Sequence, residues 1–362
     1  MSRALAPLLL LAALGGPLAA QPEETQPTQK PASGEPSFVH DPDVAPAQWG
    51  RGPFEVQDPY VLALYRARPW ATSPELPPHF GVELALRGLW ANSYAFERDR
   101  FCIDAETRHA YLSARMGILD RFAIGAQLEY QWRGGGGLDA FIEDFHDAFS
   151  LPKADRRRRP HDRYLVTGLR ADGRTFVSTA RKGYGTSDLV VEARGQALQG
   201  GPLLPALTVT LRLRLPTGSG RFELSDGVDP TLQVDMSKRL GRTPLILYAG
   251  AAYTYHAEGS LDGLLLHRHR AFGYLGAELE LGKVSLVAHV WAESPRERKL
   301  WRDGPNIKAT KLIVGNAISY VAFGVKVEPL EGLTLEVGAL ENIVDPEVTA
   351  DLGLMFNITL RL

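Results

Sequence analysis

Apolar and polar side chains alternate along most of the chain beyond residue 80. At 122–133 apolar residues occupy every second position, from Phe122 to Trp132, with small or polar residues between them. The same alternation returns at 207–215 and at 352–362. Successive side chains of a β-strand point to opposite faces, so each stretch predicts a strand with one apolar and one polar face.

Twelve such segments follow one another, and together they predict an all-β protein. They are 80–96, 105–118, 121–133, 186–199, 204–216, 228–240, 243–258, 268–282, 283–294, 310–327, 332–342 and 348–362. The connections alternate in length, because 119–120 and 241–242 are short whereas 134–185 and 295–309 are long. A soluble sandwich of two sheets also shows alternating residues. The lengths of the connections must therefore decide between a sandwich and a barrel. Short turns at one end and long loops at the other are typical of an antiparallel transmembrane β-barrel.

Aromatic residues at strand ends next to long connections support this prediction. They are Trp90, Tyr94, Phe96, Tyr130, Trp132, Tyr253, Tyr255, Phe272 and Tyr274. A barrel that spans a membrane carries aromatic girdles at the lipid interfaces. We therefore expect these residues to form the outer girdle.

The longest connection contains a helical pattern. Apolar residues recur at helical spacing in 138–149, and acidic residues occupy the other face, which predicts an amphipathic helix. The apolar face carries Leu138, Phe141, Ile142, Phe145 and Phe149. Three positions are open to this helix: inside the lumen, across the outer mouth, or packed on the rim of the barrel.

A hairpin is predicted after the helix, at 164–182, with its turn at 172–173, where Asp precedes Gly. Its strands are short and mixed in character, so we expect an extracellular hairpin on a barrel of 12 strands. A barrel of 14 strands, which counts the hairpin as part of the wall, is the alternative.

The first 79 residues precede the predicted barrel and divide into three parts. Residues 1–20 have the basic start, short apolar run and small final residues of a cleaved signal peptide. Residues 21–50 are rich in Pro, Gln, Glu and Thr, which predicts a disordered periplasmic linker. Residues 51–79 interleave prolines with large apolar residues, which predicts a segment that docks on or in the barrel. Resting on the periplasmic rim is the favoured alternative, and insertion into the lumen as a plug is the other.

On the predicted strands, charged residues recur at the positions between the apolar ones. They should therefore face the predicted lumen. The ion network expected there consists of Arg87, Arg115, Glu129, Arg133, Glu192, Arg194, Arg212, Arg214, Asp235, Glu278 and Glu280. Positive and negative residues on these rows are nearly balanced, and buried charges need partners. This favours ion pairs across the interior over a strongly selective pore, and a solute path lined by the same groups is the alternative.

Other candidate chemistry is sparse. Arg156, Arg157, Arg158 and Arg159 form a run that could bind lipid phosphates, although a solvated loop is favoured. The histidines and Cys102 do not occur at metal-ligand spacing, and the sequence contains no recognisable nucleophile motif or P-loop. We therefore predict no enzyme activity, no metal and no cofactor. The formal net charge of −2 gives no indication of a nucleic-acid partner.

Three short motifs of the sequence are distinctive. They are Gly-Pro-Phe-Glu-Val-Gln-Asp-Pro at 52–59, Phe-Ile-Glu-Asp-Phe-His at 141–146 with Phe-Ser-Leu-Pro at 149–152, and Leu-Arg-Leu-Pro-Thr-Gly at 213–218. With these motifs the sequence resembles the domain of unknown function 3187 family of proteobacterial outer-membrane proteins. The resemblance extends from about residue 52 to the end of the sequence. The resemblance implies a barrel in the outer membrane and no known activity.

The sequence thus predicts a barrel in the outer membrane of a Gram-negative bacterium. The favoured function is a pore or channel for small solutes. The alternative is a non-conducting barrel that binds an envelope lipid or a protein partner through its long extracellular loop. Outer-membrane lipid and small solutes are the expected partners, and the oligomeric state is not predicted.

Overall fold

The fold is described from a computed structural model of the chain. It describes residues 50–97, 101–149, 161–169, 175–177, 182–218, 227–261, 264–295, 297–299, 318–344 and 349–362. The predicted signal peptide, nearly all of the predicted linker and the run from Arg156 to Arg159 lie outside these residues, as does the start of the strand expected at 310–327.

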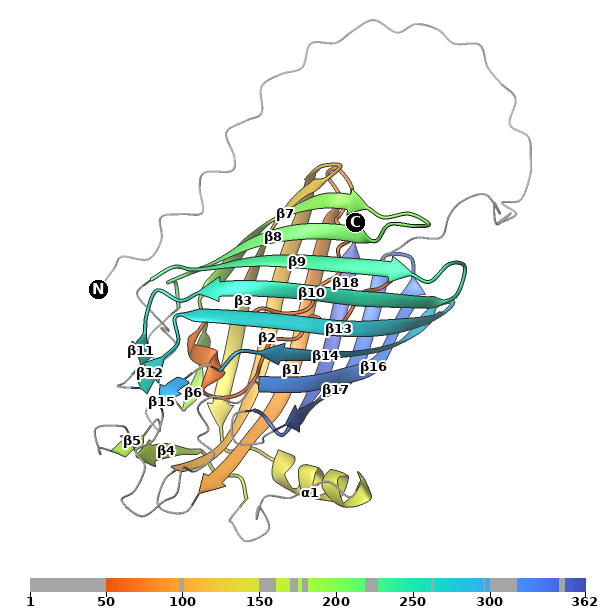
Figure 1. The fold of residues 1–362 in the computed structure, drawn as a ribbon. Helices are drawn as coiled ribbons and strands as arrows, with labels where there is room; N and C mark the ends of the chain where they lie inside the picture. The colour runs from red at the N-terminus through yellow and green to blue at the C-terminus, as the bar shows by residue number, and fades with distance from the viewer. Residues whose placement is uncertain are drawn as a thin grey trace, which may run out of the picture. The chain divides into compact units, whose positions relative to one another are not determined.

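Twelve antiparallel strands form a closed ring, as the alternation predicted (Figure 1). They are β1 (Val82–Glu97), β2 (Phe101–Leu119), β3 (Phe122–Gly134), β7 (Leu189–Gln199), β8 (Ala206–Leu215), β9 (Asp229–Arg239), β10 (Leu245–Tyr255), β13 (His269–Leu281), β14 (Val284–Glu293), β16 (Ile318–Leu330), β17 (Leu333–Val344) and β18 (Leu352–Arg361). The ring closes where β1 pairs with β18, from Glu83 opposite Arg361 to Asn92 opposite Leu352. The predicted all-β barrel of 12 strands is confirmed.

Six shorter strands lie outside the ring. β4 (Leu165–Leu169) and β5 (Thr175–Val177) form a hairpin that continues from β2, and β6 (Gly183–Thr186) pairs with β3. A separate small sheet contains β11 (Ser260–Leu261), β12 (Leu264–Leu266) and β15 (Glu297–Lys299). This sheet was not predicted, because strands of two or three residues are too short to show a period of two.

The two ends of the ring differ. The "short-turn end" carries the tight connections β2–β3, β7–β8, β9–β10, β13–β14 and β16–β17. The "loop end" carries the long connections and, with them, the shorter strands and the helix (Figure 1). β1 starts and β18 finishes at the short-turn end, because Val82 pairs with Leu362 through two backbone hydrogen bonds.

The outer wall of the ring is apolar. Along β2, for example, Leu112 is 60% exposed, whereas Arg115 on the opposite face is 5% exposed. On the other strands, exposed apolar residues likewise occupy every second position. Examples are Leu84, Leu86, Phe122, Ile124, Leu128, Leu211, Leu232, Leu275, Leu286, Phe356 and Ile358. Such a wall suits hydrocarbon better than water. Among the described residues, no helix is long and apolar enough to cross a membrane.

The predicted aromatic girdle needs a correction. Tyr130 and Tyr253 are exposed, but Tyr94, Phe272 and Tyr274 are buried. The Tyr274 hydroxyl donates a hydrogen bond to the carbonyl of Thr72 over 2.9 Å, so this side chain points into the ring. Phe272 lies two residues earlier on the same face of β13. The strand end was right for Phe272 and Tyr274, but their parity puts them on the inner face of β13. Tyr94 belongs to the outward-facing row of β1, with Leu84 and Leu86, and is nevertheless only 2% exposed.

The helix α1 (Leu138–Phe149) has the bounds that its apolar spacing predicted. Leu138 and Ile142 are buried against Leu352 of β18, with Trp90 of β1 packed beside them. Leu352 shares its parity with the outward-facing row of β18, so the helix packs on the outer wall at the loop end. It lies neither in the lumen nor across the mouth of the ring.

Candidate functional site

The segment 50–78 enters the ring at the short-turn end. Arg51 donates a hydrogen bond of 2.7 Å to the carbonyl of Gly282, in the tight turn between β13 and β14. Farther along, Arg66 reaches the loop end, where it donates to the carbonyl of Glu258 over 2.7 Å. The first leg of the segment therefore runs the length of the lumen.

The segment then turns at the short helix η1 (Ala63–Tyr65) and returns. On the way back, Glu75 lies 2.8 Å from Arg361, at the end of β18 next to the short-turn end. Nearly every residue from Gly52 to Pro74 is buried or half-buried. The segment is thus a hairpin of coil with both legs inside the ring, which corresponds to the plug alternative.

Side chains of the wall satisfy the backbone of this segment. A coil has no hydrogen-bond ladder of its own, so its buried carbonyls need donors from elsewhere. The donors and their acceptor carbonyls are Lys326 to Pro53 (3.0 Å), Thr107 to Pro59 (3.3 Å), Gln233 to Trp70 (2.9 Å), Tyr274 to Thr72 (2.9 Å), Arg194 to Ser73, and Thr208 to Pro74 (2.5 Å). The contacts come from strands all around the ring, so the segment fills the lumen rather than lining one side.

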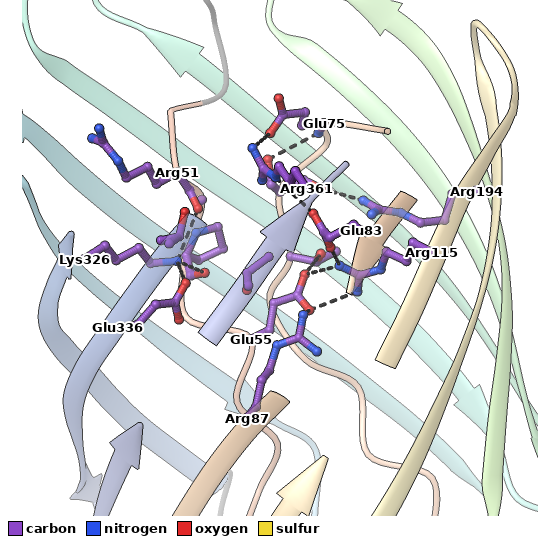
Figure 2. Close-up of a pocket in the computed structure, with 16 residues that line it drawn as sticks. Arg51, Glu55, Glu75, Glu83, Arg87, Arg115, Arg194, Lys326, Glu336 and Arg361 are labelled. Carbon is purple, nitrogen blue, oxygen red and sulfur yellow. Dashed lines mark hydrogen bonds and ion pairs between the residues drawn. The ribbon is translucent and has the colours of Figure 1, made fainter. Parts of the chain in front are cut away.

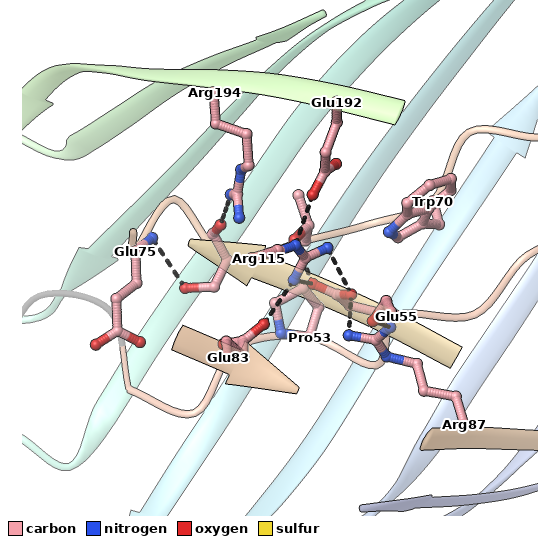
Figure 3. A network of polar contacts seen from close by, with 12 residues as sticks. Pro53, Glu55, Trp70, Glu75, Glu83, Arg87, Arg115, Glu192 and Arg194 are labelled. Carbon is pink, nitrogen blue, oxygen red and sulfur yellow. Dashed lines mark hydrogen bonds and ion pairs between the residues drawn. The ribbon is translucent and has the colours of Figure 1, made fainter. Parts of the chain in front are cut away.

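An ion cluster joins the first leg to β1, β2 and β7. Glu55 lies 2.5 Å from Arg87 and 2.8 Å from Arg115. Arg115 also contacts Glu83 over 2.9 Å and Glu192 over 2.6 Å (Figure 3). One guanidinium therefore holds three carboxylates, one from the segment and two from the wall.

A second ion cluster holds the returning leg. Arg68 lies 2.5 Å from Glu129 of β3, and both side chains are at most 5% exposed. The other oxygen of Glu129 contacts Nδ1 of His109 over 2.7 Å. The carboxylate is thus fully engaged between a cation of the segment and a ring nitrogen of the wall.

Apolar packing also holds the segment. The Phe54 ring fits against Gly324 of β16 and Gly338 of β17, which face each other in register. A Cβ atom at Gly338 would come within 3.2 Å of the ring, so a side chain there would push Phe54 away. Tyr60, Val61, Leu62 and other residues of the segment belong to the main buried apolar cluster of the molecule.

All eleven residues of the predicted lumen network point into the ring, but the pairs they form differ in kind. Arg115, Glu192 and Arg212 form a continuous chain along the wall. Arg239 pairs with Glu280, and Arg87 and Glu129 pair with the segment. Arg194, Arg133, Asp235 and Glu278 make hydrogen bonds to neutral groups, and Arg214 pairs with two aspartates that the sequence reading had not singled out.

Sequence reasoning missed the segment's own contribution to this network. Arg51, Glu55 and Arg68 all lie in the proline-rich stretch, where no period assigns a face to a side chain. A signal was nevertheless present. Charged residues that alternate with large apolar ones in a segment expected to dock must find partners on the surface they contact.

A cluster at the loop end surrounds His256, which lies just beyond β10. Its Nδ1 lies 2.9 Å from Asp229, which also pairs with Arg214. Burial lowers the pKa of the His256 imidazole to about 4, although the hydrogen bond with Asp229 acts in the opposite direction. The ring is therefore neutral at neutral pH.

The remaining candidate residues lie elsewhere. Ile142 is fully buried against the outer wall, Phe141 is 46% exposed, and Phe145 is half-buried. Phe149 ends α1, and its side chain lies outside the described part of the chain, as does the run from Arg156 to Arg159. In the part of the chain that the structure describes, no group of three or more His, Cys, Asp or Glu side chains could hold a metal ion.

The closed ring, its apolar outer wall and its buried polar interior define an antiparallel β-barrel of the transmembrane type. A family model described as "Protein of unknown function (DUF3187)" matches residues 41–362, and the chain belongs to this family. No curated protein matches the sequence.

Solved structures with a similar fold are distant in sequence. The COG4313 outer membrane channel from Pseudomonas putida F1 is 11% identical, with 80% of this chain and 97% of that chain covered and a TM-score of 0.50. The translocator domain of the autotransporter NalP from Neisseria meningitidis is 10% identical, with 78% and 88% covered and a TM-score of 0.40. A FadL homologue from Pseudomonas aeruginosa is 10% identical, with 78% and 89% covered and a TM-score of 0.36. At such identities the likeness concerns the fold alone.

Proposed function

We propose that the protein is an outer-membrane channel for small hydrophilic solutes that its own segment 50–78 holds closed. The apolar outer wall supports a place in a bilayer, and the likeness in fold to the outer membrane channel from Pseudomonas putida F1 is consistent with the outer membrane of a Gram-negative bacterium. The short-turn end then faces the periplasm, and the loop end faces the outside.

The size of the ring supports a channel. In barrels of about eight strands the wall's own side chains fill the interior, whereas barrels of 16–18 strands leave an aqueous channel. The twelve strands here fall between these cases. Much of the interior is filled by the segment, so its departure would leave a wider lumen.

The observation that carries the proposal is the chemistry of the wall that faces the segment. Its Lys, Thr, Gln, Tyr and Arg side chains donate to carbonyls of the segment, and Lys326, Gln233 and Tyr274 also donate to carboxylates of the wall. Water could accept the same hydrogen bonds if the segment left. The wall is therefore suited to both states, closed on the segment and open to water.

Conductance in planar bilayers tests the proposal. The full mature chain is expected to show little or no current, and a variant that lacks 50–78 is expected to form stable open channels. A variant that lacks only 21–49 serves as the control and should stay closed. If the barrel without 50–78 folds and inserts but carries no current, the channel proposal is wrong.

A second candidate function is contact with an envelope lipid at the loop end. The observation in its favour is the position of α1 on the outer wall, where Phe141 is exposed. Lipid that co-purifies with the protein, and that is lost on changing Phe141 to Ser or Arg156–Arg159 to Ser, would support this function. Protein that purifies without lipid would count against it.

A further inference from the structure

A polar pocket lies between the two legs of the segment at the short-turn end of the lumen (Figure 2). Its empty space amounts to about 460 Å³, part of which is open to solvent. Six cationic side chains contribute to its lining: Arg51, Arg87, Arg115, Arg194, Lys326 and Arg361. Four carboxylates also line it, so cations are in excess.

Five of the six cations are already neutralised by carboxylates. The pairs are Arg51 with Glu328 (3.0 Å), Arg87 with Glu55 (2.5 Å), Arg115 with Glu55 (2.8 Å), Lys326 with Glu336 (2.7 Å) and Arg361 with Glu75 (2.8 Å). These pairs also engage all the carboxylates of the lining except Glu83, which Arg115 and Arg361 contact. The carboxylates therefore repel an incoming anion less than their number suggests.

Arg194 of β7 is the exception. It is 3% exposed, and its Nη2 donates a hydrogen bond to the carbonyl of Ser73 on the returning leg. Its Nε is buried and has no acceptor, and its guanidinium forms no ion pair among the described residues, although Glu192, Asp235 and Glu55 attract it from a longer distance. Its neighbour Glu192 is engaged by Arg115 and Arg212.

A buried guanidinium without a counter-ion is unfavourable, because removing a charge from water requires compensation from a partner. The other buried cations of the pocket obtain this compensation from the protein. At Arg194 a soluble anion can supply it, since the pocket opens toward solvent at the short-turn end.

We propose that this pocket binds one small oxyanion, a carboxylate or a phosphate, with Arg194 as its principal ligand. A guanidinium suits both groups, because its planar array of N–H donors matches two oxygens of the anion. Glu55 of the first leg and Ser73 of the returning leg both line the pocket. The site is therefore complete only while the segment occupies the lumen.

Isothermal titration of the full chain in detergent tests the site, with inorganic phosphate and acetate as separate probes and ionic strength held constant with chloride salt. Arg194→Gln should weaken binding at least tenfold. Arg121→Gln is the matched control, because Arg121 is an exposed arginine in the tight turn between β2 and β3, outside the pocket lining. Its affinity should stay within twofold of the wild type.

The two probes distinguish the sources of the oxyanion. Tighter binding of phosphate supports a phosphate ligand, and tighter binding of acetate supports a carboxylate ligand. If the wild type binds neither probe, or if Arg194→Gln binds as tightly as the wild type, the proposal is wrong. Arg194→Lys keeps the charge and removes the planar array of donors, so several-fold weaker binding is expected even if Arg194→Gln fails to fold. These measurements need no solute flux, so they test the site independently of the channel.

Discussion

Arg68 and Glu129 show how single residues fix the segment in the lumen. The pair is 2.5 Å apart and almost fully buried, and the two residues are 61 positions apart in the sequence. A buried ion pair contributes little net stability, but removing one partner strongly destabilises the protein, because the remaining charge stays buried without compensation.

Arg68→Met should therefore loosen the returning leg. Loss of one partner of a buried ion pair destabilises by about 3–5 kcal/mol. The expected result is faster proteolysis within 50–78 and faster amide hydrogen exchange there, with the strands unchanged. Adding Glu129→Gln should restore part of the protection, and Arg121→Met is the control. Equal protection in Arg68→Met and the wild type would show that this pair does not hold the segment.

His256 makes stability depend on pH. Its pKa is about 4 in the folded protein, against an ordinary value of 6.5, so the unfolded chain binds a proton between these values and the folded chain does not. The contribution of His256 is complete above pH 6.5 and is lost as the pH falls toward 4. A shift of this size corresponds to about 3 kcal/mol.

His256→Gln should remove this part of the pH dependence. The measurement is the free energy of unfolding from pH 7 to pH 4 for the wild type and the variant. The wild type should lose more stability than the variant over this interval. Parallel curves would mean that the imidazole titrates near its ordinary pKa.

At the residue scale, the sequence predicted which charges face inward but not which partners they have. Parity assigned Arg115 and Glu192 to the lumen, because a strand repeats every two residues. Their partner Glu55 lies in a coil, where no period assigns a face. The neutral contacts of Arg194 and Arg133 were also beyond prediction, since they depend on where the segment passes.

Among the elements, α1 was predicted to the residue, whereas its position was not. The spacing of apolar residues shows that a helix has one apolar face to bury. It does not show which surface of the protein that face packs against. The structure buries that face on the outer wall, where Leu138 and Ile142 meet Leu352.

Ile142→Ala tests this packing. Truncating a fully buried Ile destabilises by about 2–5 kcal/mol, so α1 should lose its protection from hydrogen exchange while the ring keeps its own. Phe141→Ala is the control, because Phe141 is 46% exposed. A uniform loss of protection across the strands would mean that the helix supports the whole barrel rather than resting on its wall.

The segment 50–78 is the element that sequence reasoning described least well. Its prolines excluded a helix and its apolar residues predicted docking, but the rim was favoured over the lumen. Its path depends on donors from strands scattered over the whole chain, and only the closed ring brings these donors together. A linear sequence carries no signal of that convergence.

For the molecule as a whole, the pattern of the sequence was sufficient to give the closed ring. Alternation, strand length and the rhythm of short and long connections all point to a barrel, and none depends on a specific partner residue. The content of the lumen is a different matter, since inward-facing side chains can surround water, other side chains or a segment of the chain.

An engineered disulfide can show whether the segment 50–78 lies inside the ring. The backbone N of Val61 lies 3.4 Å from Oγ of Ser93, so the two residues are neighbours inside the ring. In a Cys102→Ser background, Val61→Cys with Ser93→Cys should form a cross-link under mild oxidation in isolated membranes. Val61→Cys with Leu112→Cys, which places the second cysteine on the outer wall, should not. If the first pair stays reduced while the cysteine at position 61 reacts freely with a water-soluble maleimide, the segment lies outside the lumen and the account is wrong.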